Sequence, residues 1–336
     1  MSDEVKENIL RYIKREVRHY KLLYISWFGG EPLLNKNFLI NFISRVKAIC
    51  VEEKTPFISN ITTNGYNLDI NTFHKLVESN LLFYQITLDG TEAVHNFLRP
   101  HVNPNCNSFI RVLENLVNIK KTPYKRFRVS IRVNVSHELL KNLDEFMHLL
   151  QDNFSNDKRF SVIWHQIRDW GGMSDEFRTI TTESIQNLSS NLNVKAYQYN
   201  INPYILKPKV KDVLCSACKK NAYIIDTYGN VSKCVLCHDI ARTVDINKQN
   251  DNRIGYIDKQ GYLVINKEKE AKWIVRNRLS SECRDCSVLP VCLEAICPNY
   301  RKFSENCINC TADKNYYKSI LLSLCDETSN TIKIIS

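Results

Sequence analysis

The chain contains 336 residues, of which 43% are hydrophobic and 24% are charged, and its formal charge is +10. This composition is typical of an ordinary globular protein that is long enough for one large domain or two. We expect a cytoplasmic protein with no membrane or nucleic-acid partner, because the sequence has no apolar run long enough to span a bilayer, no signal core and no aromatic-and-basic motif.

Segments of helical and strand character alternate over the first 200 residues. Helices are expected from apolar residues at helical spacing, such as Val5, Ile9 and Ile13, and strands from runs of β-formers that end at turn residues. The expected helices cover residues 3–19, 37–52, 70–80, 107–120 and 138–151, and the expected strands cover residues 22–28, 57–65, 82–90, 127–135 and 159–167. This alternation predicts a parallel sheet or barrel with right-handed crossovers.

Polar side chains gather where these strands end. In "YISWFGGEPLLN", Gly29 and Gly30 end a strand, Glu31 lies in the turn, and Pro32 can open the following helix. Each group alone is ordinary turn chemistry, but the ends of parallel strands share one edge, so together they predict a binding pocket. The set is Glu31, Thr63, Asn64, Thr87, Asp89, Arg132, Asn134 and His165.

The cysteines are concentrated in the last third of the chain. Of 13 cysteines, only Cys50 and Cys106 precede residue 215. We therefore divide the chain into a domain at residues 1–201, a linker at 202–212, a cysteine-rich domain at 213–325 and a tail at 326–336. In a cytoplasmic chain, dense cysteines indicate metal binding more than disulfides.

Close cysteine pairs are typical of zinc sites and of iron–sulfur clusters. Four CxxC pairs would suffice for two tetrathiolate zinc sites, although this interpretation leaves Cys292 and Cys297 unused. The pairs are Cys215 with Cys218, Cys234 with Cys237, Cys283 with Cys286, and Cys307 with Cys310.

Four motifs carry a resemblance to a known family: "WFGGEPLL", "TTNG", "ITLDGTEAVHNFLRP" and "VIWHQIRDWGG". They resemble the successive strand-end motifs of radical SAM enzymes, and most closely those of peptide and protein maturases that carry a C-terminal SPASM domain. The resemblance covers almost the whole chain. It implies an α/β fold, a partial (β/α)6 barrel that lacks its first strand, followed by a small cysteine-rich SPASM domain.

The resemblance also implies a site for S-adenosylmethionine. Gly29, Gly30 and Glu31 match the turn that holds the amino end of the cofactor. Thr87 and Asp89 match the strand end beside its sugar, and Arg132 matches an arginine that faces its carboxylate. Thr63 and Asn64, from "TTNG", complete the expected cofactor-binding edge.

In the SPASM pattern the cysteines hold two auxiliary [4Fe–4S] clusters. Gly229-x4-Cys234 and Cys283-x2-Cys286-x5-Cys292 match that pattern in spacing. By analogy, one cluster would be bound by Cys215, Cys218, Cys234 and Cys297, and the other by Cys283, Cys286, Cys292 and either Cys310 or Cys307. Cys237 and Cys325 receive no role.

One element of the family is missing from the sequence. The CxxxCxxC loop that holds the catalytic cluster lies upstream of the GGE turn in the family, yet the first cysteine here is Cys50. The first strand and this loop look absent, which would leave S-adenosylmethionine binding incomplete. The first explanation that we expect for this absence is a late assigned start or a truncated gene. The second is a degenerate, non-catalytic homologue.

The resemblance implies a radical maturase that abstracts hydrogen from a side chain of a ribosomally made peptide or protein. In the sulfatase-maturing branch an aspartate base follows the cysteine that Cys234 matches, but Val235 stands here and cannot accept a proton. The alternatives are a zinc-binding tetrathiolate protein and a non-catalytic, cluster-bearing homologue that holds a peptide.

Overall fold

The computed structural model describes residues 1–166, 182–204, 215–234, 253–274 and 285–286. The chain divides into two compact units. The barrel unit comprises Glu16–Asp169 and Ser174–Leu206, and the C-terminal unit comprises Met1–Arg15, Trp170–Met173 and Lys207–Ser336. The first 15 residues, which we expected to belong to the barrel, therefore group with the C-terminal unit. No helix within the described ranges is both long and apolar enough to cross a bilayer.

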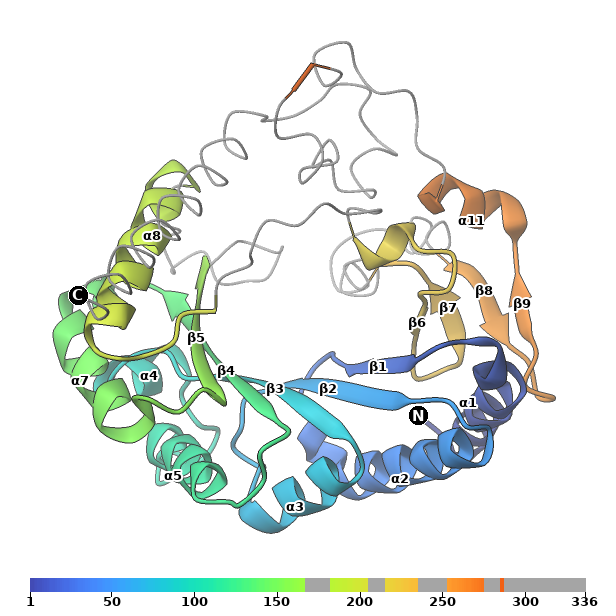
Figure 1. Cartoon of the computed structure of the whole chain (residues 1–336), viewed down its shortest axis with the longest axis horizontal. Coiled ribbons are helices and arrows are strands. Elements are labelled where there is room, and N and C mark those ends of the chain that lie inside the picture. The colour runs from blue at the N-terminus through green and yellow to red at the C-terminus, as the bar shows by residue number, and fades with distance from the viewer. Residues whose placement is uncertain (167–181, 205–214, 235–252, 275–284, 287–336) are drawn as a thin grey trace, which may run out of the picture. The chain divides into compact units, whose positions relative to one another are not determined.

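The barrel unit is built on a five-stranded parallel sheet of order β1-β2-β3-β4-β5 (Figure 1). Each strand pairs with the next one along the chain, and helices form the crossovers, which confirms the predicted α/β class and a partial barrel. β1 is an edge strand of this sheet, and none of its side chains is fully buried. The strands are β1 Leu23–Trp27, β2 Phe57–Thr63, β3 Leu81–Thr87, β4 Arg128–Val135 and β5 Phe160–Gln166.

The helices of this unit follow the predicted order, with three departures. The helix expected over residues 138–151 is two helices, α6 and α7, which meet at Asn142. Two helices were not predicted: α4 is too short for a periodicity to show, and α8 is only weakly amphipathic. The elements are η1 Val17–His19, η2 Pro32–Asn35, α2 Lys36–Glu52, α3 Ile70–Glu78, α4 Glu92–Leu98, α5 Ser108–Lys120, α6 His137–Lys141, α7 Leu143–Phe154 and α8 Thr182–Gln198.

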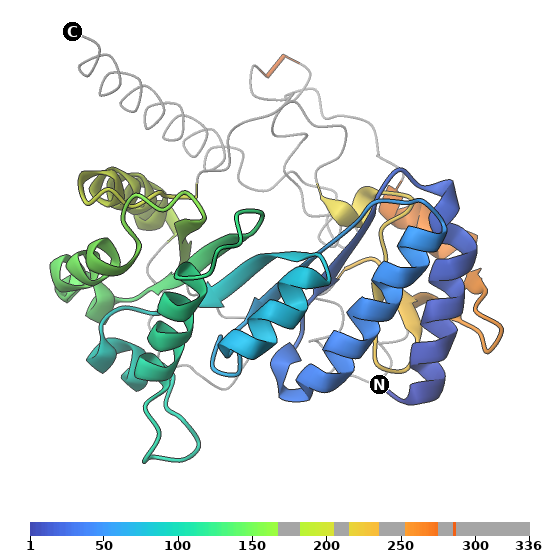
Figure 2. The same ribbon diagram turned by 60° about the horizontal axis from the view of Figure 1, so that its bottom comes forward.

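The two faces of the sheet differ in burial. Figures 1 and 2 show α2, α3 and α5 along one face, and the buried strand residues, such as Ile61, Ile86 and Val133, form the core. Alternate residues on β2 and β4 are only half-buried, whereas a strand covered on both faces is buried throughout. The half-buried positions are largely polar and include Asn60, Thr62, Arg132 and Asn134.

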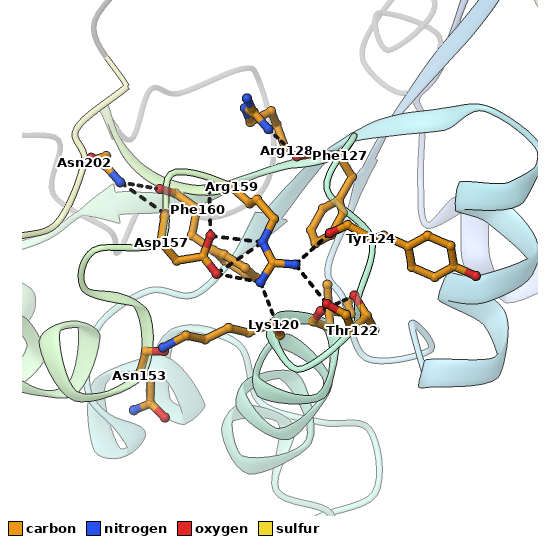
Figure 3. Close-up of polar contacts among 11 residues, drawn as sticks. Lys120, Thr122, Tyr124, Phe127, Arg128, Asn153, Asp157, Arg159, Phe160 and Asn202 are labelled. Carbon is orange, nitrogen blue, oxygen red and sulfur yellow. Dashed lines mark hydrogen bonds and ion pairs between the residues drawn. The ribbon is translucent and has the colours of Figure 1, made fainter.

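The amino-terminal end of β5 is fastened by Arg159 (Figure 3). Its guanidinium donates to the carbonyl oxygens of Lys120, Thr122 and Tyr124 at 2.6, 3.1 and 2.8 Å. It also donates to the carboxylate of Asp157, with Nη2 2.7 Å from Oδ2. Burial raises the pKa of Asp157, but the hydrogen bonds and charge of Arg159 outweigh it and hold that pKa below its usual value. A single side chain thus ties the α5–β4 loop to the turn before β5.

We predict that Arg159→Lys lowers the free energy of unfolding by about 3 kcal/mol, because one ammonium cannot serve all the carbonyls that the planar guanidinium reaches. Urea denaturation of the full chain measures this change in the free energy of unfolding. The control is Arg126→Lys, at an exposed position of the same loop, which should change stability by less than about 0.5 kcal/mol. Equal effects of the two substitutions would contradict the role assigned to Arg159.

The described part of the C-terminal unit contains a small antiparallel sheet of order β6-β7-β8-β9. Two arginines of α1 donate to the β8–β9 turn: Arg11 to the carbonyl of Lys259 at 2.7 Å, and Arg15 to that of Gly261 at 2.9 Å. Gly261 has a φ of +77°, and a Cβ there would lie 2.5 Å from Cβ of Arg11. The elements are α1 Asp3–Glu16, η3 Ser216–Cys218, β6 Ile224–Ile225, β7 Asn230–Ser232, β8 Arg253–Ile257, β9 Leu263–Ile265 and α11 Lys267–Ile274.

Candidate functional site

The carboxylate of Glu31 joins the ends of the first two strands of the barrel unit. Its Oε1 accepts hydrogen bonds from the hydroxyl of Thr63 at 2.6 Å and from the backbone N–H of Leu33 at 2.9 Å. Its Oε2 accepts one from the backbone N–H of Asn64 at 2.7 Å. A carboxylate offers about four acceptor positions, so this one keeps capacity for a further donor. The structure therefore brings together Glu31, Thr63 and Asn64, as predicted.

Open space adjoins the backbone just before Glu31. Gly29 and Gly30 have φ values of +104° and +41°, and a Cβ added at either residue would meet no atom within 4 Å. In contrast, a Cβ at Gly65, after Asn64, would lie 2.6 Å from Cγ2 of Ile86. Packing thus requires the glycine at residue 65, whereas the pair at 29 and 30 leaves its backbone accessible to a ligand.

Asp89 is the centre of a second polar cluster, at the end of β3. Its Oδ1 accepts the backbone N–H of Asn134 at 2.7 Å, and its Oδ2 accepts Nε of Arg99 at 2.5 Å. The residue is only 2% exposed. Because protein donors occupy this carboxylate, its direct effect is to fix the end of β4 against the loop that follows β3.

Arg132 lies on β4 opposite Thr87 in the strand register. Its Nε donates to Oδ1 of Asn134 at 3.2 Å, and Asn134 in turn lies opposite His165 on β5. Burial holds the pKa of Arg132 below its usual value, although the charge of Asp89 opposes this shift. The predicted edge is therefore two clusters at the carboxyl ends of neighbouring strands, one around Glu31 and one around Asp89.

Sequence reasoning missed two members of the Asp89 cluster, Arg99 and His95. Both lie within the motif "ITLDGTEAVHNFLRP", and α4 places them beside the aspartate. Nδ1 of His95 accepts the backbone N–H of Asp89 at 3.1 Å, so this nitrogen carries no proton. Burial lowers the pKa of His95 to about 4, although the charge of Asp89 opposes the shift. His95 is therefore neutral at physiological pH.

We predict that the protein loses stability as the pH falls from about 6.5 to about 4, where the unfolded chain binds a proton that folded His95 excludes. The depressed pKa contributes about 3 kcal/mol above pH 6.5, and this contribution disappears toward pH 4. Urea denaturation across this range measures the slope. His95→Asn keeps an acceptor for the Asp89 N–H but does not titrate, so its slope should be smaller. Equal slopes would contradict the prediction.

Three of the predicted metal-binding cysteines, Cys215, Cys218 and Cys234, lie within one described stretch of the C-terminal unit, residues 215–234. Sγ of Cys215 accepts the backbone N–H of Ala217 at 3.3 Å, Cys218 is buried, and Cys234 follows β7 at half-burial. An N–H donor to sulfur favours a thiolate ligand, so this turn fits metal binding. Cys286 is half-buried, whereas Cys50 is a buried thiol whose pKa burial raises to about 11.

The remaining predicted ligands lie outside the described residues: Cys283, Cys292, Cys297, Cys310 and its alternative Cys307. Cys237 and Cys325 lie there as well. Among the residues that the structure describes, no group of three or more Cys, His, Asp or Glu side chains is arranged to hold a metal ion. The ligand sets therefore stay predictions.

The radical SAM superfamily matches residues 2–150, which include β1 to β4 and both polar clusters. Residues 2–150 form a radical SAM domain. No curated protein sequence matches the chain.

Solved structures resemble the chain over most of its length. Native anSMEcpe with bound AdoMet has a TM-score of 0.70 at 15% identity, covering 100% of this chain and 91% of that one. Its complex with the Cp18Cys peptide has a TM-score of 0.70 at 16% identity, covering 100% and 92%. Streptococcus suis SuiB bound to precursor peptide SuiA has a TM-score of 0.54 at 16% identity, covering 88% of this chain and 66% of that one. At these identities the likeness shows a shared fold.

Proposed function

We propose that this protein is a radical SAM/SPASM maturase that modifies a side chain of a ribosomally made peptide or protein in the cytoplasm, where thiolates stay reduced. The observation that carries the proposal is the Glu31 cluster: a carboxylate with spare acceptor capacity beside two glycines that face open space, within a radical SAM domain. Structures of the same fold were determined with AdoMet and with peptides, which supports both the cofactor and the substrate class.

Each residue of the edge has a distinct task in this proposal. Glu31 would receive the ammonium of S-adenosylmethionine, and the open backbone at Gly29 and Gly30 would accommodate its methionine part. Arg132 would face the cofactor carboxylate. Thr87 and Asp89 would border the sugar, with Asp89 acting through the backbone that it fixes. Reductive cleavage of the bound cofactor, by one electron from a [4Fe–4S] cluster such as the family holds on its CxxxCxxC loop, would supply a 5′-deoxyadenosyl radical that abstracts hydrogen from the substrate.

The cysteines of the C-terminal unit would hold two auxiliary [4Fe–4S] clusters, which take up an electron or bind the substrate. We assign Cys215, Cys218, Cys234 and Cys297 to one cluster, and Cys283, Cys286, Cys292 and Cys310 to the other. The turn at Cys215, with its N–H donor to sulfur, supports the first set. Zinc is the competing metal for such a thiolate set.

We predict that the full chain binds AdoMet and that Glu31→Ala weakens binding at least tenfold, since an ammonium would lose its charged partner. Gly30→Asn should do the same. Asparagine tolerates a positive φ, and its side chain would enter the space that is open beside Gly30. Calorimetric titration with AdoMet measures the affinity of each variant and of the unsubstituted protein.

The control for these variants is Glu145→Ala, which removes an exposed carboxylate of α7 and should leave AdoMet affinity unchanged. Unfolding midpoints of all three variants separate lost binding from lost folding. Gly30→Asn is the sharper variant, because it leaves the hydrogen bonds of Glu31 in place. Unchanged affinity in a folded Gly30→Asn protein would contradict the assigned cofactor site.

We also predict that anaerobic reconstitution yields a brown protein with about eight iron atoms per chain, four for each of two clusters. Iron, sulfide and zinc assays with the visible spectrum measure this. Cys218→Ser should remove about four of these iron atoms, whereas Cys50→Ser, at a buried cysteine of the barrel unit, should remove none. Stoichiometric zinc without iron uptake would contradict the cluster assignment and support the zinc-binding alternative.

A further inference from the structure

Lys233 is a buried cation immediately before Cys234, at the end of β7. Its side chain is 0% exposed. Its ammonium donates to the carbonyl oxygens of Lys219, Lys220 and Ala222 at 2.8, 3.1 and 3.1 Å. An ammonium has three N–H donors and a neutral amine has only two. The three carbonyls therefore match the charged form.

The surroundings of Lys233 show that its charge is only partly balanced. The ammonium lies 3.6 Å from Oε1 of Glu270 on α11 and 4.4 Å from the ring centroid of Tyr223. Glu270 is shared, since Tyr223 donates to it at 3.1 Å and Lys267 lies 3.4 Å away. The ammonium of Lys233 therefore shares the carboxylate of Glu270 with Tyr223 and Lys267.

The position of Lys233 links the elements that carry three predicted ligands. The carbonyls that it binds belong to the segment directly after Cys218, and that segment follows the turn that begins at Cys215. Lys233 itself directly precedes Cys234. The ammonium thus fixes the Cys215–Cys218 turn relative to the strand end that bears Cys234. A buried cation is costly without partners, and the three carbonyls with Glu270 are the partners that hold this one between the two cysteine-bearing elements.

We propose that Lys233 positions the segments that bear Cys215, Cys218 and Cys234 for binding a metal centre, and that its buried charge raises the reduction potential of the centre once it is bound. The inference rests on the proposed function, which assigns an iron–sulfur cluster to these cysteines. Reduction adds negative charge to a cluster, and a cation in a low-dielectric surrounding stabilises the reduced form more than the oxidised form. Lys233 is therefore expected to act both on assembly and on potential.

The experiment compares reconstituted full-length variants by iron assay and by redox titration followed by electron paramagnetic resonance. Lys233→Met removes the buried charge at similar side-chain length, and the potential of one cluster should become more negative. Glu270→Gln removes the opposing charge and retains the contact with Tyr223, so the same potential should become more positive. Lys220→Met is the control, because it removes a positive charge from the same loop at an exposed position and should shift nothing.

Shifts of opposite sign in the two buried variants would support the inference, because a purely structural role changes cluster content and not the sign of a potential. If Lys233→Met retains no cluster, Glu270→Gln decides: a positive shift supports the inference, and no shift overturns it. Normal iron content with identical potentials in all variants overturns the inference alone. Absence of iron from the unsubstituted protein overturns the proposed function and this inference with it.

Discussion

The carboxylate of Glu31 is the constraint on which the candidate cofactor site depends. It receives hydrogen bonds from three donors, at Leu33, Thr63 and Asn64, and so fixes the turn after β1 against the end of β2. Charge-assisted hydrogen bonds of this kind are about twice as strong as neutral ones. With the turn held in this way, Gly29 and Gly30 can keep backbone exposed to open space without the packing that would otherwise order them.

The two clusters at the carboxyl edge of the sheet are built differently, and their chemistry differs accordingly. Glu31 is only half-buried and keeps acceptor capacity, which suits direct contact with a cationic ligand group. Asp89 is nearly inaccessible, and Arg99 and Asn134 occupy its oxygens. Neutral His95 accepts the backbone N–H of Asp89 and so adds no charge to this cluster. One cluster presents a carboxylate, while the other uses a carboxylate to shape the backbone around it.

Cations that bind several backbone carbonyls recur in both units, with Arg159 half-buried and Lys233 fully buried. Arg159 binds the carbonyls of Lys120, Thr122 and Tyr124 far along the chain. Lys233 does the same for the segment after Cys218. Irregular backbone leaves carbonyls unpaired, and a buried cation satisfies several of them at once. Each cation also has a carboxylate nearby, Asp157 or Glu270, which offsets the cost of burying the charge.

Much of the fold and part of the site followed from the sequence alone. The five parallel strands were predicted because β-formers alternate with amphipathic helices, and the Glu31, Thr63 and Asn64 cluster because strand ends of a parallel sheet share one edge. Local periodicity could not show α4, which is seven residues long, or the division of the helix at Asn142. A helix of that length has too few turns to display an apolar stripe.

Only the tertiary structure decided which polar groups are free and which are occupied. Sequence spacing gives Asp89 and Glu31 the same appearance, a carboxylate at a strand end, but burial and the donors from Arg99 and Asn134 separate their roles. Lys233 likewise reads as an ordinary surface lysine until its three carbonyl partners are known. The physical reason is common to these cases. Strand order follows from local patterns of side chains, whereas the state of a charged group depends on partners that the folded chain brings from distant positions.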